Sequence, residues 1–328
     1  MSDTAHDIWT KTSATVSTAT VRDSSRLRDS SRLRDFVDLL KPRVMSLVVF
    51  TAWIGLVIAP VHIHPFAAAL AVLAVALGSG AAGAINMWYE RDLDALMTRT
   101  ANRPLPQGRV APDDALGLGV LLSIFSLVLM AVATNYVAMA LLAAAILFYV
   151  FVYTIWLKRR TPQNIVIGGA AGAFPPMIGW AAATGDVSTV GVALFALIFL
   201  WTPPHFWALS LYRSEDYRRA GVPMLPVVAG PRETKRQMLI YTLVLAPVSL
   251  APTLLGAVGW IYGATAVVLG LAFIGHAVVV WRTADDETAH PAARRMFFFS
   301  LFYLAALFAA LPVDHFVGRL ISTQMIGG

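Results

Sequence analysis

VLLSIFSLVLMAVA, residues Val120–Ala133, contains almost no polar side chain. A helix on the surface of a soluble protein needs a polar outer face, and this stretch offers none. Together with its neighbours, the run reaches the roughly 20 apolar residues that a helix needs to cross a bilayer. The stretch therefore predicts a transmembrane helix and argues against a large soluble helical protein.

Composition extends this prediction to the whole chain. Of the 328 residues, 58% are hydrophobic and 13% are charged, whereas about a quarter of a soluble protein is charged. The sequence contains no cysteine, which excludes disulfides and thiolate metal ligands. We therefore expect an all-α integral membrane protein. Its nine predicted transmembrane helices are 44–60, 66–89, 114–132, 136–156, 164–182, 189–211, 238–256, 258–281 and 296–313.

The positive charges predict how these helices are oriented. With nine spans, every lysine and arginine except Arg319 falls in the N-terminal tail or in connections on one side of the membrane. Positively charged connections stay in the cytoplasm, so we expect the N-terminus inside and the C-terminus outside, most simply in a bacterial inner membrane. The net charge of +6 then suits anionic lipids and substrates and needs no nucleic acid.

Three regions follow from these patterns. Residues 1–38 are predicted to be a disordered basic tail with a DSSRLR repeat, 39–316 the membrane domain and 317–328 a short C-terminal tail. A short basic amphipathic helix on the membrane surface is the alternative for the N-terminal tail. The first apolar run starts after about forty residues, too late for a secretory signal peptide. Two connections on the predicted cytoplasmic side, about 91–113 and 213–235, are long and polar, and such loops usually carry function.

The first polar connection follows the stretch NMWYERDLDALMTRTANRPLP, Asn86–Pro106. Asn86, Glu90 and Asp94 are spaced four residues apart, so they drift by only about 40° per step around a helix. One helix face thus presents an amide and two carboxylates, the hard oxygen donors that suit Mg²⁺. Arg99 and Arg103 follow, and arginine can bind phosphate with two parallel hydrogen bonds.

The second polar connection reads YRSEDYRRAGVPMLPV, Tyr212–Val227. It combines Glu215 and Asp216 with Arg213 and two further arginines. Two acidic and basic clusters on one side of a membrane suggest a diphosphate held between them by Mg²⁺. The alternative is that these are solvated charges at the membrane edge that pair with one another.

Three segments, in order, resemble a known family. They are LLKPRVMSLVVFTAWIGL (Leu39–Leu56), the stretch from Asn86 to Pro106, and WTPPHFWALSLYRSEDYRRAGVPMLPVV (Trp201–Val228). Together they resemble the intramembrane prenyltransferases related to 4-hydroxybenzoate polyprenyltransferase, and within them the branch that farnesylates protohaem IX. The resemblance covers about residues 39–316.

The resemblance implies nine helices around a central cavity, capped by the two polar loops. It implies Mg²⁺, farnesyl diphosphate, and haem B as a substrate rather than a prosthetic group. The product carries a hydroxyethylfarnesyl group, with water supplying the hydroxyl. Membrane lipids surround the protein, and haem-delivery or oxidase-assembly proteins are further expected partners. An aromatic or quinone precursor is the alternative acceptor, and a transporter or a non-catalytic haem-binding factor are the rival classes.

The resemblance also assigns residues. Asn86, Glu90, Asp94 and Asp216 match the metal-binding and catalytic positions, although Glu90 stands where aspartate is usual. The basic positions near the diphosphate are Lys41, Arg43, Arg99 and Arg103, with Arg213 beside the second motif.

His205 lies in WTPPHFW, where an ionisable residue inside the membrane is a functional candidate. Two interpretations stay open: contact with haem, or a hydrogen bond to carbonyls freed by Pro203 and Pro204.

Overall fold

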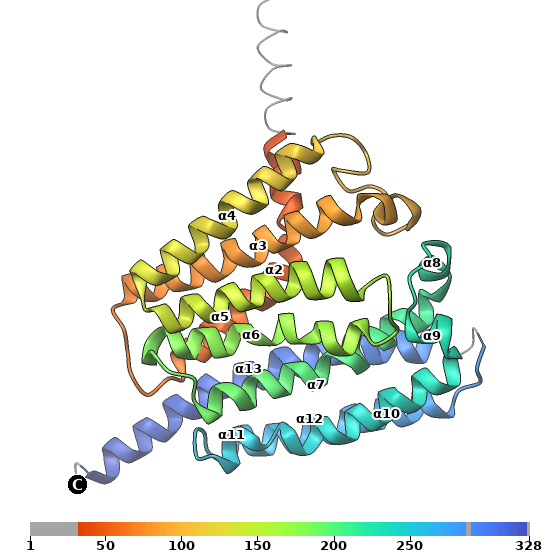
Figure 1. Cartoon of the computed structure of the whole chain (residues 1–328). Coiled ribbons are helices and arrows are strands. Elements are labelled where there is room, and N and C mark those ends of the chain that lie inside the picture. The colour runs from red at the N-terminus through yellow and green to blue at the C-terminus, as the bar shows by residue number, and fades with distance from the viewer. Residues whose placement is uncertain (1–31, 287–289, 327–328) are drawn as a thin grey trace, which may run out of the picture.

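A computed structural model describes residues 32–286 and 290–326, and within them all regular structure is helical (Figure 1). A helix at Arg32–Leu39 comes first. The other elements are α2 (Pro42–Val57), α3 (Pro65–Leu96), α4 (Pro112–Ala133), α5 (Tyr136–Leu147), η1 (Phe148–Leu157), α6 (Asn164–Thr184), α7 (Thr189–Tyr212), α8 (Ser214–Arg219), α9 (Leu225–Val228), α10 (Gly230–Val248), α11 (Ala251–Leu254), α12 (Trp260–Arg282) and α13 (His290–Ile326).

The prediction of an all-α membrane protein is confirmed. Within the described ranges, eight helices are long and apolar enough to cross a membrane, and a bent pair raises the number to nine. The pair consists of Arg32–Leu39 and α2, which meet at 50°. The first predicted span, 44–60, corresponds to α2, whose 16 residues fall short of a bilayer crossing alone.

The two predicted tails differ from the structure. Residues 32–38 are helical rather than disordered, because Phe36 and Leu39 pack against Ala84 and Met87 of α3. Residues 1–31, which hold most of the DSSRLR repeat, lie outside the described residues. At the other end, α13 continues to Ile326, so residues 317–326 extend the last helix instead of forming a separate tail.

Small residues let α2 and α6 pack backbone to backbone. A Cβ on Gly55 would lie 2.0 Å from the carbonyl oxygen of Pro176, and a Cβ on Gly179 would lie 1.9 Å from that of Ala52. Such close approach is typical of helix contacts in membranes, where apolar side chains gain little from leaving lipid. This contact fixes α2, and with it the residues at its N-terminus, against the centre of the bundle.

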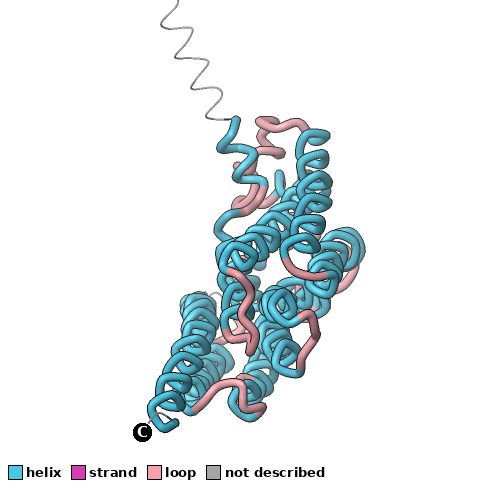
Figure 2. Tube along the Cα trace, turned by 90° about the vertical axis from the view of Figure 1, so that its left-hand side faces the viewer, coloured by secondary structure: helices cyan, strands magenta, loops and turns pink. Residues whose placement is uncertain are grey.

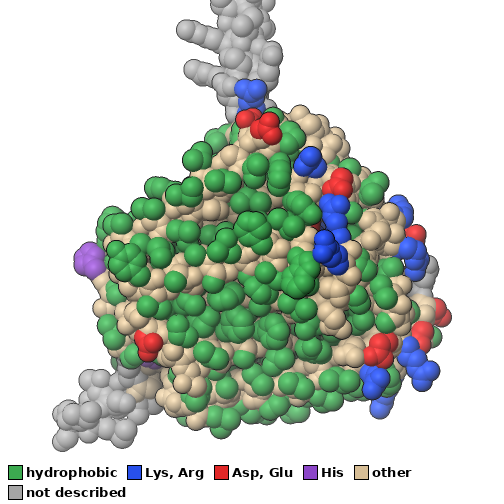
Figure 3. Space-filling model, viewed as in Figure 1, with side chains coloured by type: hydrophobic (Ala, Val, Ile, Leu, Met, Phe, Trp, Pro, Cys, Tyr) green, Lys and Arg blue, Asp and Glu red, His purple; other side chains and the backbone are tan. Residues whose placement is uncertain are grey.

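The surface is divided into a broad apolar face and one charged edge. Figure 3 shows hydrophobic side chains over a broad face, with lysines, arginines and acids gathered along the edge where α8 and the end of α3 lie in Figure 1. Leu121 and Val132 of α4 are 68% and 82% exposed, as expected for lipid contact. Figure 2 shows the opposite ends of the helices and their connections. The protein is therefore an integral membrane protein with a polar end.

Candidate active site

The last turns of α3 carry a buried polar face. Asn86, Glu90 and Asp94 are only 2%, 1% and 3% exposed, and the alanines and glycines that precede them let neighbouring helices approach closely. A charged group is rarely buried unless it is paired. Each of the three side chains accordingly has a polar partner from another segment or from the following loop.

The π-helical segment η1 and the residue that follows it supply two of these partners. Asn86 donates through Nδ2 to Thr154 Oγ1 at 3.0 Å, and Lys158 Nζ forms a 2.5 Å ion pair with Glu90 Oε2. π-helical turns are rare and are frequent at functional sites, because the wider turn redirects side chains. Here η1 aims Thr154 and Lys158 at the polar face of α3.

Lys41 approaches the same face from the break before α2. Its ammonium donates to Asn86 Oδ1, and its backbone is left-handed, with a φ of 53°. A non-glycine residue in this region is strained, by about 1–3 kcal/mol, and such strain gathers at functional sites. The sharp bend between the first helix and α2 thus places a cation against the amide.

Asp94 and Asp216, the acids nearest to the two polar loops, are each paired with a basic side chain. Arg103 Nη1 lies 2.7 Å from Asp94 Oδ2, while Thr98 Oγ1 donates to Asp216 Oδ1 at 2.9 Å. Arg219 pairs with Asp216 as well. The two motifs, more than a hundred residues apart in sequence, therefore meet through the Thr98–Asp216 hydrogen bond.

The environment of Asp216 acts on its pKa in two directions. Burial raises the pKa of the carboxyl, but the hydrogen bonds from Thr98 and Arg219 and the positive charge of Arg219 lower it. The net result is a pKa below the usual value, so the group is anionic at neutral pH and suited to a cationic or metal-bound ligand.

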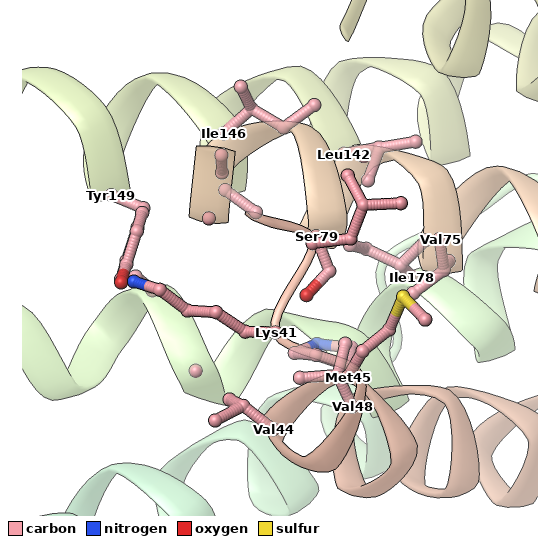
Figure 4. A pocket seen from close by; sticks show the side chains of 18 residues that line it. Lys41, Val44, Met45, Val48, Val75, Ser79, Leu142, Ile146, Tyr149 and Ile178 are labelled. Atoms are coloured by element: carbon pink, nitrogen blue, oxygen red, sulfur yellow. The ribbon is translucent and has the colours of Figure 1, made fainter. Parts of the chain in front are cut away.

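An apolar cavity of about 130 Å³ begins beside this cluster (Figure 4). Lys41 and Tyr149 lie at one end, next to Asn86, and the walls beyond them come from α2, α3, α5 and α6. The apolar lining includes Val44, Met45, Val48, Val75, Leu142 and Ile178. A polar head at Lys41 and an apolar tail in the cavity would match an amphiphile.

The donor set fits Mg²⁺ without forming a preassembled site. Glu90 Oε1 is buried and has no hydrogen-bond partner, which leaves one carboxylate oxygen for a cation. However, no group of three acidic or histidine side chains is gathered closely enough to hold a metal ion within residues 32–286 and 290–326. Instead, Glu90 forms an ion pair with Lys158, and Asp94 forms one with Arg103.

Over the described part of the chain, the other predicted basic residues do not pair with the acids of α3 as Lys158 and Arg103 do. Arg43, Arg99 and Arg213 are exposed, and none of them forms an ion pair in the part of the chain that the structure describes. The structure brings Lys41 and Arg103 into the cluster but shows no contact between Arg43 and the acids. Asp92, which the spacing sets apart from the polar face, is 62% exposed at its side chain and pairs with Arg159.

His205 is buried between aromatic rings of two helices. Its ring stacks on Trp201 at 4.2 Å and on Phe297 at 4.7 Å between centroids. Its Nδ1 lies 2.6 Å from Ser300 Oγ, and that hydroxyl donates to the carbonyl of Phe297. The hydrogen bond therefore goes to a serine side chain of α13 and not to carbonyls freed by the prolines of α7.

Sequence reasoning missed Thr98, Thr154 and Lys158. The motifs emphasised acids and arginines, and hydroxyl side chains give no comparable signal. Lys158 belongs to the basic run Lys158–Arg160, whose charge in the sequence indicates only the orientation of the helices. Its role depends on the π-helical turn of η1, for which no pattern in the sequence is diagnostic.

The fold and site together define a membrane-embedded helical bundle with a charged cluster at the mouth of an apolar cavity, suited to an anionic amphiphile. Residues 48–302 match the UbiA prenyltransferase family. The chain is 57% identical over 287 residues to protoheme IX farnesyltransferase 2 of Mesorhizobium japonicum, covering 88% of this chain and 91% of that protein. It is 59% identical over 279 residues to protoheme IX farnesyltransferase of Afipia carboxidovorans, covering 85% and 89%. The chain belongs to the UbiA prenyltransferase family, as the sequence motifs predicted.

Solved structures share the fold at low identity. A structure of digeranylgeranylglyceryl phosphate synthase aligns with a TM-score of 0.72 at 18% identity, covering 87% of this chain and 99% of that one. A UbiA homolog from Archaeoglobus fulgidus, bound to DMAPP and Mg²⁺, aligns with a TM-score of 0.63 at 18% identity, covering 85% and 99%. Thus a protein of this fold holds a prenyl diphosphate together with Mg²⁺.

Proposed function

We propose that this chain transfers the farnesyl group of farnesyl diphosphate to a vinyl group of protohaem IX. Water adds in the same reaction, so the products are haem O and diphosphate. Relatives that share more than half of their aligned residues with this chain are protoheme IX farnesyltransferases. The structural observation that carries the proposal is the buried polar face of α3 at the mouth of an apolar cavity.

The diphosphate would lie between the two polar loops. Arg99 and Arg213 are exposed and free of carboxylate partners among the described residues, so they can bind phosphate oxygens directly. On substrate binding, Lys41 would give up its hydrogen bond to Asn86, and Arg103 its ion pair with Asp94. Both side chains would bind the diphosphate instead. Their present hydrogen bonds keep these buried groups satisfied when no substrate is bound.

Asn86, Glu90, Asp94 and Asp216 would hold Mg²⁺ on the other side of the diphosphate. When bound, Mg²⁺ supplies positive charge that stabilises the leaving diphosphate. Thr154 holds the amide of Asn86 through its nitrogen, which leaves the amide oxygen to face the ligand. In this site of low polarity, fixed charges act more strongly than they would in water.

The apolar cavity between α2 and α6 would take part of the isoprenoid chain. Its lining of valine, leucine and isoleucine excludes water from the allylic carbon after the diphosphate departs. The electron-rich vinyl group of protohaem forms the new bond to that carbon. Water must then reach the cation that this bond leaves on the former vinyl group of the porphyrin. Water is therefore excluded only from the part of the site that holds the farnesyl chain.

His205 is the group on this chain best suited to bind the haem iron. The single proton of the Ser300 hydroxyl is donated to Phe297, so Nδ1 of His205 donates to Ser300. This tautomer leaves the lone pair of Nε2 for a metal, and a histidine ligand typically donates through its other nitrogen in this way. Loss of the haem absorbance shift in His205→Ala, with Ser300→Ala as a milder variant, would support ligation; an unchanged spectrum would reject it.

The charged end of the bundle would face the cytoplasm, with the N-terminus inside and the C-terminus outside. The support is the gathering of basic residues at the edge that carries α8. In a bacterium this places the enzyme in the inner membrane, where lipids surround it and haem-delivery or oxidase-assembly proteins are its natural partners. Labelling of an introduced cysteine at Asn102 from the cytoplasmic side only would support this orientation, and labelling only from outside would contradict it.

The direct test is turnover by the purified protein in detergent with protohaem, farnesyl diphosphate and Mg²⁺. The expected product is a haem heavier by one farnesyl group and one hydroxyl group, and chelation should abolish it. Diphosphate release only with an aromatic acceptor would retain the prenyltransferase and overturn the choice of protohaem.

A further inference from the structure

A groove lies between the end of α7 and the start of α13. It has a volume of about 670 Å³ and is lined by Tyr212, His290, Pro291, Arg294, Arg295 and Phe298. This volume falls in the range of about 300–1,000 Å³ that is usual for small-molecule sites. The start of α13 lies at the same end of the bundle as α8 and the end of α3 (Figure 1). The groove is therefore at the charged end of the bundle and separate from the cavity beside Lys41.

The two arginines of this groove have no carboxylate partner among residues 32–286 and 290–326. Neither Arg294 nor Arg295 forms an ion pair with any residue that the structure describes. Arg294 instead lies 5.7 Å from the centroid of the Phe298 ring. Two adjacent, exposed guanidinium groups make a strong site for carboxylates, because each can donate two parallel hydrogen bonds.

Aromatic rings lead from the groove into the bundle. Tyr212, in the groove wall, lies 6.2 Å from Phe297 between ring centroids, and Phe297 stacks on His205 at 4.7 Å. His205 and Tyr212 are seven residues apart on α7, so they are separated by about 10 Å along the helix axis. This spacing is comparable with the distance from the centre of a porphyrin to its propionate carboxylates.

The groove also adjoins the proposed diphosphate site. Tyr212 lies within electrostatic range of Arg213, Arg294 and Arg99. These three arginines come from the second polar loop, α13 and the first polar loop respectively. A ligand that reached past Tyr212 would therefore approach the two clusters proposed to bind diphosphate.

We propose that this groove binds the propionate carboxylates of the protohaem substrate, with Arg294 and Arg295 as their ion-pair partners. The inference rests on the proposed function. In protohaem the two propionates and the two vinyl groups occupy opposite edges of the ring. Carboxylates held at the polar mouth thus turn the vinyl edge inward, past Tyr212, where the farnesyl group is delivered. Arg294 and Arg295 select the orientation of the acceptor and do not take part in bond formation.

The test compares full-length wild type with Arg294→Gln/Arg295→Gln in detergent. We expect the double variant to bind protohaem at least about tenfold more weakly, because hydrogen bonds to two charged groups are removed. The KM for farnesyl diphosphate and the melting temperature should stay unchanged. Protohaem dimethyl ester, which lacks the carboxylates, should bind wild type and variant equally. Arg236→Gln, which removes an exposed arginine of α10 paired with Glu233, is the matched control.

Three results would overturn the inference. Unchanged protohaem affinity in the double variant would reject it while leaving the proposed function intact. Equal weakening for protohaem and its dimethyl ester would show that the arginines do not recognise carboxylates. Loss of stabilisation by phosphatidylglycerol in mixed micelles, with normal protohaem affinity, would assign the groove to an anionic lipid. If wild type neither binds nor converts protohaem, the proposed function itself fails.

Discussion

The charged side chains of two regions differ in burial and in pairing. One region is the cluster around Glu90 and Asp94 on α3, and the other is the groove beside α13. In the cluster, Glu90 and Asp94 are buried and each is paired with a basic side chain. In the groove, Arg294 and Arg295 are exposed and no carboxylate of the described residues pairs with them. A buried charge needs an opposite charge beside it whether or not a ligand is bound, because burial removes its solvating water. An exposed charge is solvated by water until its ligand binds.

This difference separates the tasks of the two regions. The cluster must exchange internal partners for Mg²⁺ and diphosphate, so ligand binding and local rearrangement are coupled there. The groove needs no exchange and would bind carboxylates with the present side-chain arrangement.

The first change removes a buried carboxylate of the cluster. Asp94→Asn or Glu90→Gln should lower kcat by at least about 100-fold, because the charge that holds the metal-bound leaving group is lost. Turnover with protohaem and farnesyl diphosphate measures this effect. Asp92→Asn is the control, since Asp92 is exposed and paired only with Arg159; equal losses in all three variants would remove the distinction between these acids.

The second change disturbs the packing that fixes α2. Gly179→Ala should destabilise the protein by about 1–3 kcal/mol or more, since the new Cβ would meet backbone rather than a movable side chain. The melting temperature in detergent measures the loss. Gly172→Ala, on the same helix but with open space at its Cβ, should leave the melting temperature nearly unchanged. A matching loss in Gly172→Ala would contradict the packing argument.

The third change breaks an exposed ion pair. Arg159→Gln should alter stability by at most about 1 kcal/mol, because water already screens the Arg159–Asp92 pair. Activity should stay near the wild-type value. A loss of activity as large as that of Asp94→Asn would mean that Arg159 belongs to the reacting site.

The fourth prediction concerns pH. The pKa of Asp216 is lowered in the folded protein, so its interactions stabilise the fold above the unfolded-state pKa of about 3.9 and are lost as pH falls through the lower folded value. The gap in melting temperature between wild type and Asp216→Asn should be present at pH 7 and should close below about pH 4. A gap that opens only on acidification would reverse the sign and reject this account.

Sequence patterns predicted the bundle because hydrophobic length and basic loops carry a strong signal. The spacing of Asn86, Glu90 and Asp94 likewise predicted a shared helix face, because helical geometry is local. Local patterns said nothing about partners from distant helices, such as Thr154 and Lys158, whose approach depends on the turn of η1. For the same reason, local patterns favoured disorder over the alternative of a short helix at residues 32–38, since Leu39 becomes buried only against α3 and α4.

The farnesylation of protohaem is tested most simply by the mass of the haem pigment that wild-type protein forms with protohaem, farnesyl diphosphate and Mg²⁺. We expect a single new haem that carries one added farnesyl group and one added hydroxyl group, is absent after chelation, and is strongly reduced in Asp94→Asn but not in Asp92→Asn. Recovery of unmodified protohaem under conditions in which the same sample binds both substrates would contradict it.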